Sequence, residues 1–192
     1  MGIEYELKFR ASEQVQQAIL ASVPGEDQHF SMQTTYYDTP SGALSARFYT
    51  LRRRMENGLS VCTLKAPAQE GRGEWEVCCD RIEGAIEELC KLGAPADLAD
   101  LVREGLVVVC GARFQRVART VVTEDCTLEL AIDRGILIGG SSEEDLCEVE
   151  VELKSGSADA CDRFALELAS RFGLEQEARS KFRRALALYK GE

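Results

Sequence analysis

Short segments in which apolar and charged residues alternate recur along the whole chain. Residues 3–10 (IEYELKFR) place apolar side chains at odd positions and charged side chains at even positions, and residues 146–154 (LCEVEVELK) repeat the pattern. Because successive side chains of a β-strand point to opposite faces, this period of two predicts strands with one apolar and one charged face. The chain must therefore bury an apolar face and also find partners for a charged one.

The alternation and the turn residues between segments predict eight strands. Asn57-Gly58 is typical of a hairpin turn, which favours antiparallel pairing of the strands on either side. The strands are expected at residues 3–10, 34–38, 48–56, 59–66, 72–78, 106–123, 126–134 and 146–154. Helices, delimited by capping and stop residues, are expected at residues 12–23, 81–92, 96–104, 157–172 and 179–189.

The charged faces constrain the arrangement of these strands. For any single strand, a solvated face of an ordinary sheet is the simpler explanation. Several strands, however, carry Arg, Lys, Glu or Asp on one face, with hardly any Ser, Thr, Gln or Asn. Eight antiparallel strands can close around an interior that holds side chains or one small ligand. The sequence therefore predicts an α+β fold, an eight-stranded antiparallel β-barrel with a charged interior and peripheral helices.

Length and charge exclude several classes of protein. The 192 residues, 45% of them hydrophobic, favour a single domain over residues 1–192 with a sizeable core. The net charge of −10 argues against general nucleic-acid binding, which depends on basic side chains. No apolar run approaches the roughly 18 residues of a membrane span, and charges near the N-terminus argue against a signal peptide. We expect a cytoplasmic protein without membrane attachment, either a monomer or a homodimer.

The eight cysteines do not indicate a zinc site. No pair has C-x-x-C spacing, and none lies near His29, the sole histidine. We expect reduced cysteines that serve as small apolar side chains.

The charged residues of the predicted interior form two sets. Carboxylates are hard oxygen ligands that suit Mg²⁺ or Mn²⁺ better than zinc. The candidate metal ligands are Glu4, Glu6, Asp133, Glu148 and Glu150. Guanidinium and ammonium groups match phosphate oxygens. The candidate anion-binding residues are Lys8, Arg10, Arg52, Arg54, Lys65, Arg116 and Lys181. Together the two sets suit a linear polyphosphate whose remaining oxygens are bridged by a metal ion.

An ordered series of motifs resembles the CYTH domains, also called triphosphate tunnel metalloenzymes. The N-terminal ExExK motif alone is a weak signal, but the whole series spans essentially the entire chain in the order of that family. The motifs are Glu4-x-Glu6-x-Lys8, Tyr37-Asp38-Thr39-Pro40, the Leu-Arg-x-Arg of residues 51–54, Thr63-Leu64-Lys65, Arg72-x-Glu74-x-Glu76, residues 131–135 (AIDRG), Glu148-x-Glu150-x-Glu152-x-Lys154 and Ser180-Lys181.

The resemblance implies a tunnel that binds a triphosphate and needs Mg²⁺ or Mn²⁺. It implies that four basic residues grip the phosphates and spread the charge of the transition state, and that two glutamates support them. The expected catalytic residues are Lys8, Arg52, Arg54 and Lys65, with Glu74 and Glu76 in support. Residues 113–119 align loosely; of Arg113, Arg116 and Arg119 we favour Arg116 for the interior. The role of Glu152, and whether a loop at 139–145 covers the tunnel mouth, stay open.

Family members include inorganic, thiamine and RNA triphosphatases, polyphosphate polymerases and class IV adenylate cyclases. We predict a metal-dependent hydrolase that converts inorganic triphosphate to pyrophosphate and phosphate, with thiamine or nucleoside triphosphates as alternative substrates. An adenylate cyclase ranks second, because no adenine-reading signature is evident. A non-catalytic polyphosphate-binding module ranks third, because carboxylates in an anion site repel the ligand unless a metal is present.

Overall fold

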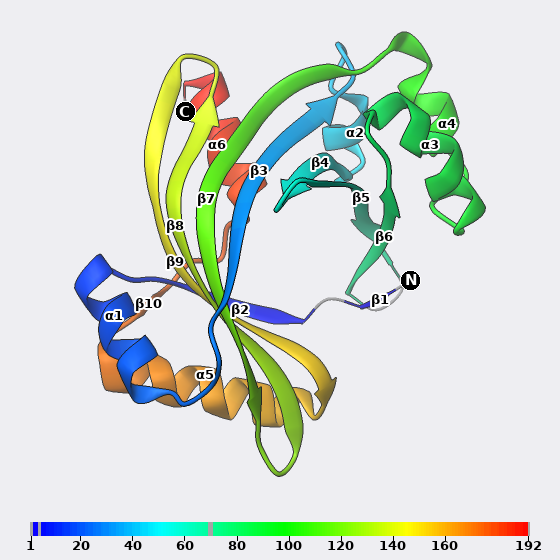
Figure 1. The fold of residues 1–192 in the computed structure, drawn as a ribbon. Helices are drawn as coiled ribbons and strands as arrows, with labels where there is room; N and C mark the ends of the chain where they lie inside the picture. Colours follow the sequence, from blue (N-terminus) through cyan, green and yellow to red (C-terminus); the bar gives the residue numbers. More distant parts are fainter. Residues whose placement is uncertain (1, 4, 69–70, 192) are drawn as a thin grey trace.

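The computed structural model describes residues 2–3, 5–68 and 71–191, and a large, strongly curved antiparallel sheet dominates it (Figure 1). Its strands are β1 (Gly2–Ile3), β2 (Glu6–Arg10), β3 (Gln28–Asp38), β4 (Thr50–Glu56), β5 (Leu59–Pro67), β6 (Arg72–Cys78), β7 (Val107–Val122), β8 (Cys126–Gly139), β9 (Ser142–Gly156) and β10 (Glu175–Gln176). The helices are α1 (Glu13–Ser22), α2 (Ala43–Ala46), α3 (Ile82–Lys91), α4 (Leu98–Leu101), α5 (Ala158–Phe172) and α6 (Lys181–Lys190), with a 3₁₀ turn at Val102–Glu104.

The strands follow the order β1-β6-β5-β4-β3-β7-β8-β9-β2-β10. The N-terminal segment has two partners, because β1 pairs with β6 while β2 pairs with β9. A few residues of chain thus connect opposite ends of the sheet. The structure confirms the α+β class and the large antiparallel sheet. The pairing order does not join its two ends into a ring, so closure of the barrel stays a prediction.

The predicted strands are found, and their boundaries differ most at the start of β3, the end of β8 and the start of β9. Strand β3 begins at Gln28 rather than residue 34; Phe30 and Met32 already alternate with exposed Ser31 and Gln33, a signal that the prediction missed. The segment around 139–145 is a tight hairpin, since β8 ends at Gly139 and β9 begins at Ser142. Gly139 is required there: a Cβ atom would lie 2.4 Å from the backbone nitrogen of Tyr189 on α6.

The apolar face of the sheet is covered by two groups of helices. Helices α1 and α5 contribute to one core with β2, β8 and β9, in which Phe9, Leu130 and Val151 are buried. Helices α3 and α4 contribute to a second core with β4, β5 and β6, around Leu51 and Leu64. The period of two seen in the sequence therefore buries its apolar positions as expected.

Helix α6 packs on the opposite, charged face. Its Phe182 and Ala185 join a third core with Tyr36 and Phe114, and the rings of Tyr36 and Phe182 lie 5.1 Å apart. The hydroxyl of Ser180 caps the helix by accepting a hydrogen bond from the backbone N–H of Arg183. The N-terminus of α6 is thereby held against the charged side chains of the sheet.

Among the described residues, no helix is both long and apolar enough to cross a lipid bilayer.

A buried glutamine fastens α1 to the strands that carry the carboxylates. The side-chain amide of Gln16, which is 0% exposed, donates to the carbonyl oxygens of Asp133 and Glu148, each 3.1 Å away. Its oxygen accepts hydrogen bonds from the guanidinium of Arg134. One side chain thus positions the backbone of β8 and β9 at two charged residues.

We predict that Gln16→Met destabilises the protein by about 1–3 kcal/mol, because buried polar groups lose their partner. Urea unfolding measures the change. The matched control is Gln17→Met, since Gln17 is exposed and donates a hydrogen bond to the exposed Glu13. The effect of this substitution should stay within about 0.5 kcal/mol. Equal effects of the two substitutions would contradict this role of Gln16.

Candidate active site

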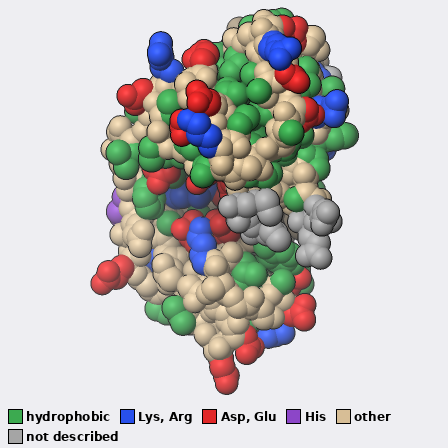
Figure 2. All heavy atoms as spheres, turned by 90° about the vertical axis from the view of Figure 1, so that its right-hand side faces the viewer, with side chains coloured by type: hydrophobic (Ala, Val, Ile, Leu, Met, Phe, Trp, Pro, Cys, Tyr) green, Lys and Arg blue, Asp and Glu red, His purple; other side chains and the backbone are tan. Residues whose placement is uncertain are grey.

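A cavity of about 630 Å³ lies against the charged face, a size typical of small-ligand sites. Side chains from each of the strands β2 to β9 and from the start of α6 line it. Figure 2 shows a hollow on this side of the molecule, in which basic and acidic side chains lie together. Several strands, among them β2, β6 and β9, contribute both acidic and basic side chains.

Strands β4 and β5 supply a basic wall. Arg52 Nη2 lies 3.6 Å from Glu74 Oε1 and 3.8 Å from Glu76 Oε1, and Lys65 Nζ lies 3.4 Å from the same oxygen of Glu74. These separations exceed ordinary hydrogen-bond lengths. The structure therefore places both glutamates beside the basic residues that they were expected to support.

Arg54, the third member of this wall, is placed deep in the molecule with part of its surface on the cavity. Burial, together with the like charge of Arg52, lowers its pKa to about 10. It donates one hydrogen bond to Thr34 Oγ1, at 3.3 Å, and forms no ion pair with any described residue. A desolvated guanidinium without a counter-ion favours binding of an anion.

Three buried carboxylates cluster on the opposite side, where Glu150 lines the cavity while Asp133 and Glu148 are buried and are not among its lining residues. Asp133, Glu148 and Glu150 each offer an oxygen, and these oxygens lie within 4.8 Å of one another. Asp133 and Glu148 are 0% exposed. Register explains the cluster, because Asp133 on β8 lies directly opposite Glu148 on β9, while Glu150 follows two residues later on the same face.

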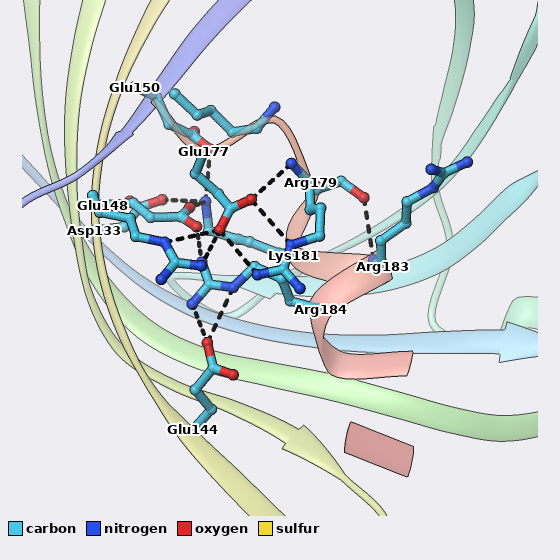
Figure 3. Close-up of polar contacts among 12 residues, drawn as sticks. Asp133, Glu144, Glu148, Glu150, Glu177, Arg179, Lys181, Arg183 and Arg184 are labelled. Atoms are coloured by element: carbon cyan, nitrogen blue, oxygen red, sulfur yellow. Dashed lines mark hydrogen bonds and ion pairs between the residues drawn. The ribbon is translucent and has the colours of Figure 1, made fainter. Parts of the chain in front are cut away.

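Lys181 of α6 points into the centre of this cluster (Figure 3). Its Nζ atom lies 2.8 Å from Asp133 Oδ2, 2.6 Å from Glu148 Oε2 and 2.6 Å from Glu150 Oε1. Burial opposes its positive charge, but the three carboxylates outweigh this and raise the pKa of Lys181. Burial likewise opposes the charge of Glu150, yet Lys181 and Arg116 hold its pKa well below the usual value.

Two arginines complete the neutralisation of the cluster. Arg116 donates to both oxygens of Asp133 at 2.7 Å and also contacts Glu150. Arg184 contacts Glu148 and donates to Glu144 Oε1 at 3.1 Å. Three cations thus surround three carboxylates.

The donor chemistry of Asp133, Glu148 and Glu150 fits a hard divalent cation such as Mg²⁺ or Mn²⁺. Of the other predicted ligands, Glu4 lies outside the described residues. Glu6 lines the cavity but is not in this cluster, and its Oε1 lies 2.7 Å from Lys8 Nζ. Burial opposes the charge of Lys8, but Glu6 outweighs it and raises the pKa of Lys8.

Glu152, whose role the sequence left open, lies opposite Glu6 on the neighbouring strand. It lines the cavity together with Glu129, and Lys154 lies 2.8 Å from Glu152 and 3.6 Å from Glu129. Its contact is therefore an ion pair beside the cluster.

The structure brings Arg116 to the cavity, but not Arg113 or Arg119. Arg113 is an exposed side chain 3.6 Å from Glu143. Arg119 instead binds Asp27 and backbone carbonyls at the end of α1.

Arg10, predicted to bind substrate, does not line this cavity. It forms an ion pair with Glu177, which also accepts hydrogen bonds from Arg179. The reason is the two-residue pairing of β10 with the end of β2, which places the segment before α6 beside Arg10. Pairing between such distant segments leaves no local signal in the sequence.

Sequence reasoning missed Tyr36 and Arg184 although a signal existed for each. Tyr36 lines the cavity and lies on the same strand face as Thr34, which alternation within β3 would have indicated. Arg184 does not line the cavity but contacts Glu148 of the cluster, and it follows Lys181 by three residues, a spacing that places both side chains on one helix face. Burial raises the pKa of Tyr36, which keeps its hydroxyl protonated beside the basic wall.

Residues 2–186 match the CYTH domain family. The chain belongs to the CYTH domain family. This confirms the resemblance seen in the motifs. The chain is 28% identical over 163 residues to the inorganic triphosphatase of Haemophilus influenzae, a match that covers 80% of this chain and 46% of that protein. The CYTH chain thus spans about half the length of this relative.

Solved structures share the fold. The Hippeastrum protein HpAC1, studied as an adenylyl cyclase and found to have a dominant triphosphatase activity, has a TM-score of 0.68 at 20% identity, over 98% of this chain and 96% of that one. A Pyrococcus horikoshii OT3 protein has a TM-score of 0.62 at 22% identity, over 97% and 99% of the two chains.

We predict that Glu177 stabilises the fold in a pH-dependent manner. Burial would raise its pKa, but hydrogen bonds from Arg179 and Arg10 outweigh this and lower the pKa from 4.5 to about 2. A lowered folded-state pKa stabilises the protein above the unfolded-state value, and this stabilisation is lost as the pH falls towards 2. The stability difference between wild type and Glu177→Gln should fall by about half or more between pH 6 and pH 3, as measured by urea unfolding.

The matched control is Glu175→Gln, an exposed glutamate of the same segment. If the stability difference between wild type and Glu177→Gln stays constant over this pH range, the contacts from Arg179 and Arg10 do not lower the pKa of Glu177.

Proposed function

We propose that this CYTH protein hydrolyses inorganic triphosphate to pyrophosphate and phosphate with Mg²⁺ or Mn²⁺. The family and the similarity to the Haemophilus influenzae inorganic triphosphatase support this activity. A protein of this kind must bind a compact polyanion, hold a divalent cation beside it and admit a water molecule.

The observation that carries the proposal is the basic wall, above all Arg54. Its guanidinium is desolvated beside Arg52 and lacks an ion-pair partner among the described residues. A triphosphate would supply several negative oxygens at this point and relieve the repulsion between the arginines. Lys65 and Lys8 line the same cavity and would contact further phosphate oxygens.

The proposed roles follow from these positions. Lys8, Arg52, Arg54 and Lys65 bind the phosphates and stabilise the charge that develops as the terminal P–O bond breaks. Glu74 and Glu76 keep Arg52 and Lys65 oriented towards the cavity. Asp133, Glu148 and Glu150 would hold the divalent cation, which supplies charge neutralisation and lowers the pKa of a water molecule. Water attacks the terminal phosphorus, and pyrophosphate leaves.

We further infer that the sheet closes around this cavity as an eight-stranded tunnel. The N-terminal segment supports closure, because its two halves pair with β6 and β9 from opposite sides of the sheet. We also propose that residues 1–192 form a single domain. We propose further that the protein is cytoplasmic and is a monomer or a homodimer.

The test is incubation of the protein with inorganic triphosphate, ATP or thiamine triphosphate in Mg²⁺, Mn²⁺ or EDTA, with products separated by chromatography. We expect EDTA-sensitive formation of pyrophosphate and phosphate from inorganic triphosphate. Arg54→Ala should lower kcat/KM at least about 100-fold, because a charge-assisted contact to the transition state is lost.

The matched control is Arg113→Ala, which removes an exposed arginine outside the cavity and should leave kcat/KM within about twofold. Cyclic AMP as the main product from ATP would replace the hydrolase with a cyclase. If thiamine triphosphate is turned over faster than inorganic triphosphate, thiamine triphosphate would be the preferred substrate. Tight triphosphate binding without turnover would leave a binding module.

A further inference from the structure

The Lys181 ammonium lies where a bound cation would be expected. Three carboxylate oxygens surround Nζ at 2.6–2.8 Å, and one of them, Asp133 Oδ2, also accepts a hydrogen bond from Arg116. Glu148 Oε2 is buried and accepts no hydrogen bond of good geometry, so its contact with Lys181 is mainly electrostatic. A metal ion bound by the same oxygens would occupy nearly the same space.

Position, rather than net charge, makes it unfavourable for Lys181 and a metal ion to occupy the cluster together. Arg116 and Arg184 also pair with Glu129 and Glu144 outside the cluster, whereas the three ion pairs of Lys181 are with Asp133, Glu148 and Glu150. A divalent cation held by the same three oxygens would lie beside the ammonium and repel it in a desolvated region. Of the three basic residues, Lys181 is the one that contacts all three carboxylates, so its departure would remove one contact from each of them.

Lys181 is also the residue best placed to move. It begins α6, and the first turn of this helix contains Arg183 and Arg184 but no acidic residue. Cations near a helix N-terminus are unfavourable, because the N–H groups there carry partial positive charge. Lys181 also lines the triphosphate cavity, so an ammonium released from the cluster faces the proposed phosphate site.

We propose that Lys181 is an internal counter-ion that competes with the divalent cation for Asp133, Glu148 and Glu150. Metal binding displaces its ammonium towards the cavity, where a triphosphate stabilises the displaced position. Metal and triphosphate therefore raise each other's affinity through one lysine. This inference rests on the proposed function in taking a divalent cation as the ligand of the cluster.

The first test is Mn²⁺ titration followed by electron paramagnetic resonance, without triphosphate and without turnover. Lys181→Met removes the competitor, so we expect it to bind Mn²⁺ about tenfold or more tightly than wild type. Lys91→Met is the matched control, because Lys91 also contacts two glutamates but lies exposed on α3; its Mn²⁺ affinity should equal that of wild type. Adding Glu148→Gln to Lys181→Met should abolish the gain.

The second test uses wild-type protein and does not depend on the folding of a variant. A buried ammonium bonded to carboxylates gives a slowly exchanging Nζ signal in ¹⁵N NMR, which Mg²⁺ should shift or abolish for Lys181 alone. Inorganic triphosphate added with Mg²⁺ should lower the Mg²⁺ concentration needed for this change.

Equal Mn²⁺ affinity in wild type and Lys181→Met, or Mg²⁺ binding with an unchanged Lys181 signal, would overturn the inference and leave the proposed hydrolase intact. Absence of divalent-cation binding with or without triphosphate would overturn both. Weaker Mn²⁺ binding by Lys181→Met would show that the lysine supports the metal rather than competing with it.

Discussion

The burial of three carboxylates on one face of two strands is the constraint on which the rest of the molecule depends. Each buried charge requires an opposite charge within a few ångströms. This requirement determines where α6 lies, since its first turn delivers Lys181 and Arg184 to the cluster. It also determines register, because a shift of one residue between β8 and β9 would exchange Glu148 for an apolar neighbour.

The two faces of the sheet have different roles: one forms hydrophobic cores, and the other carries the charged groups of the candidate site. Helices α1, α3, α4 and α5 pack on the apolar face, where they form two of the three hydrophobic cores of the described residues. The charged face is stabilised by ion pairs and by α6. Because the two faces share one backbone, packing on the outside positions groups on the inside. Gln16 is the clearest case, since its amide bonds from α1 reach the backbone of Asp133 and Glu148.

Much of this arrangement could be predicted from sequence, because the alternation of apolar and charged residues within a strand is visible in neighbouring residues. Alternation in β2 and β9 indicated which side chains share a face, and the ordered motifs indicated the family, which the comparison confirmed. Contacts set by distant segments could not be predicted. Arg10 lies on the same alternating face of β2 as Lys8. It does not line the cavity, however, because it pairs with Glu177 from the segment before α6. The burial of Gln16 likewise depends on how α1 packs, which no pattern within the helix specifies.

The order of Lys181 after β8 and β9 in the sequence has a consequence for folding. Strands β8 and β9 leave the ribosome before α6, so their carboxylates are synthesised before the helix that neutralises them. Strand β9 also pairs with β2, from the first residues, so its contacts span most of the chain. Such long-range pairing slows folding. During synthesis the acidic face must stay hydrated, and stable burial waits until α6 is available. Synthesis as far as α6 is therefore a condition for forming the core of the site.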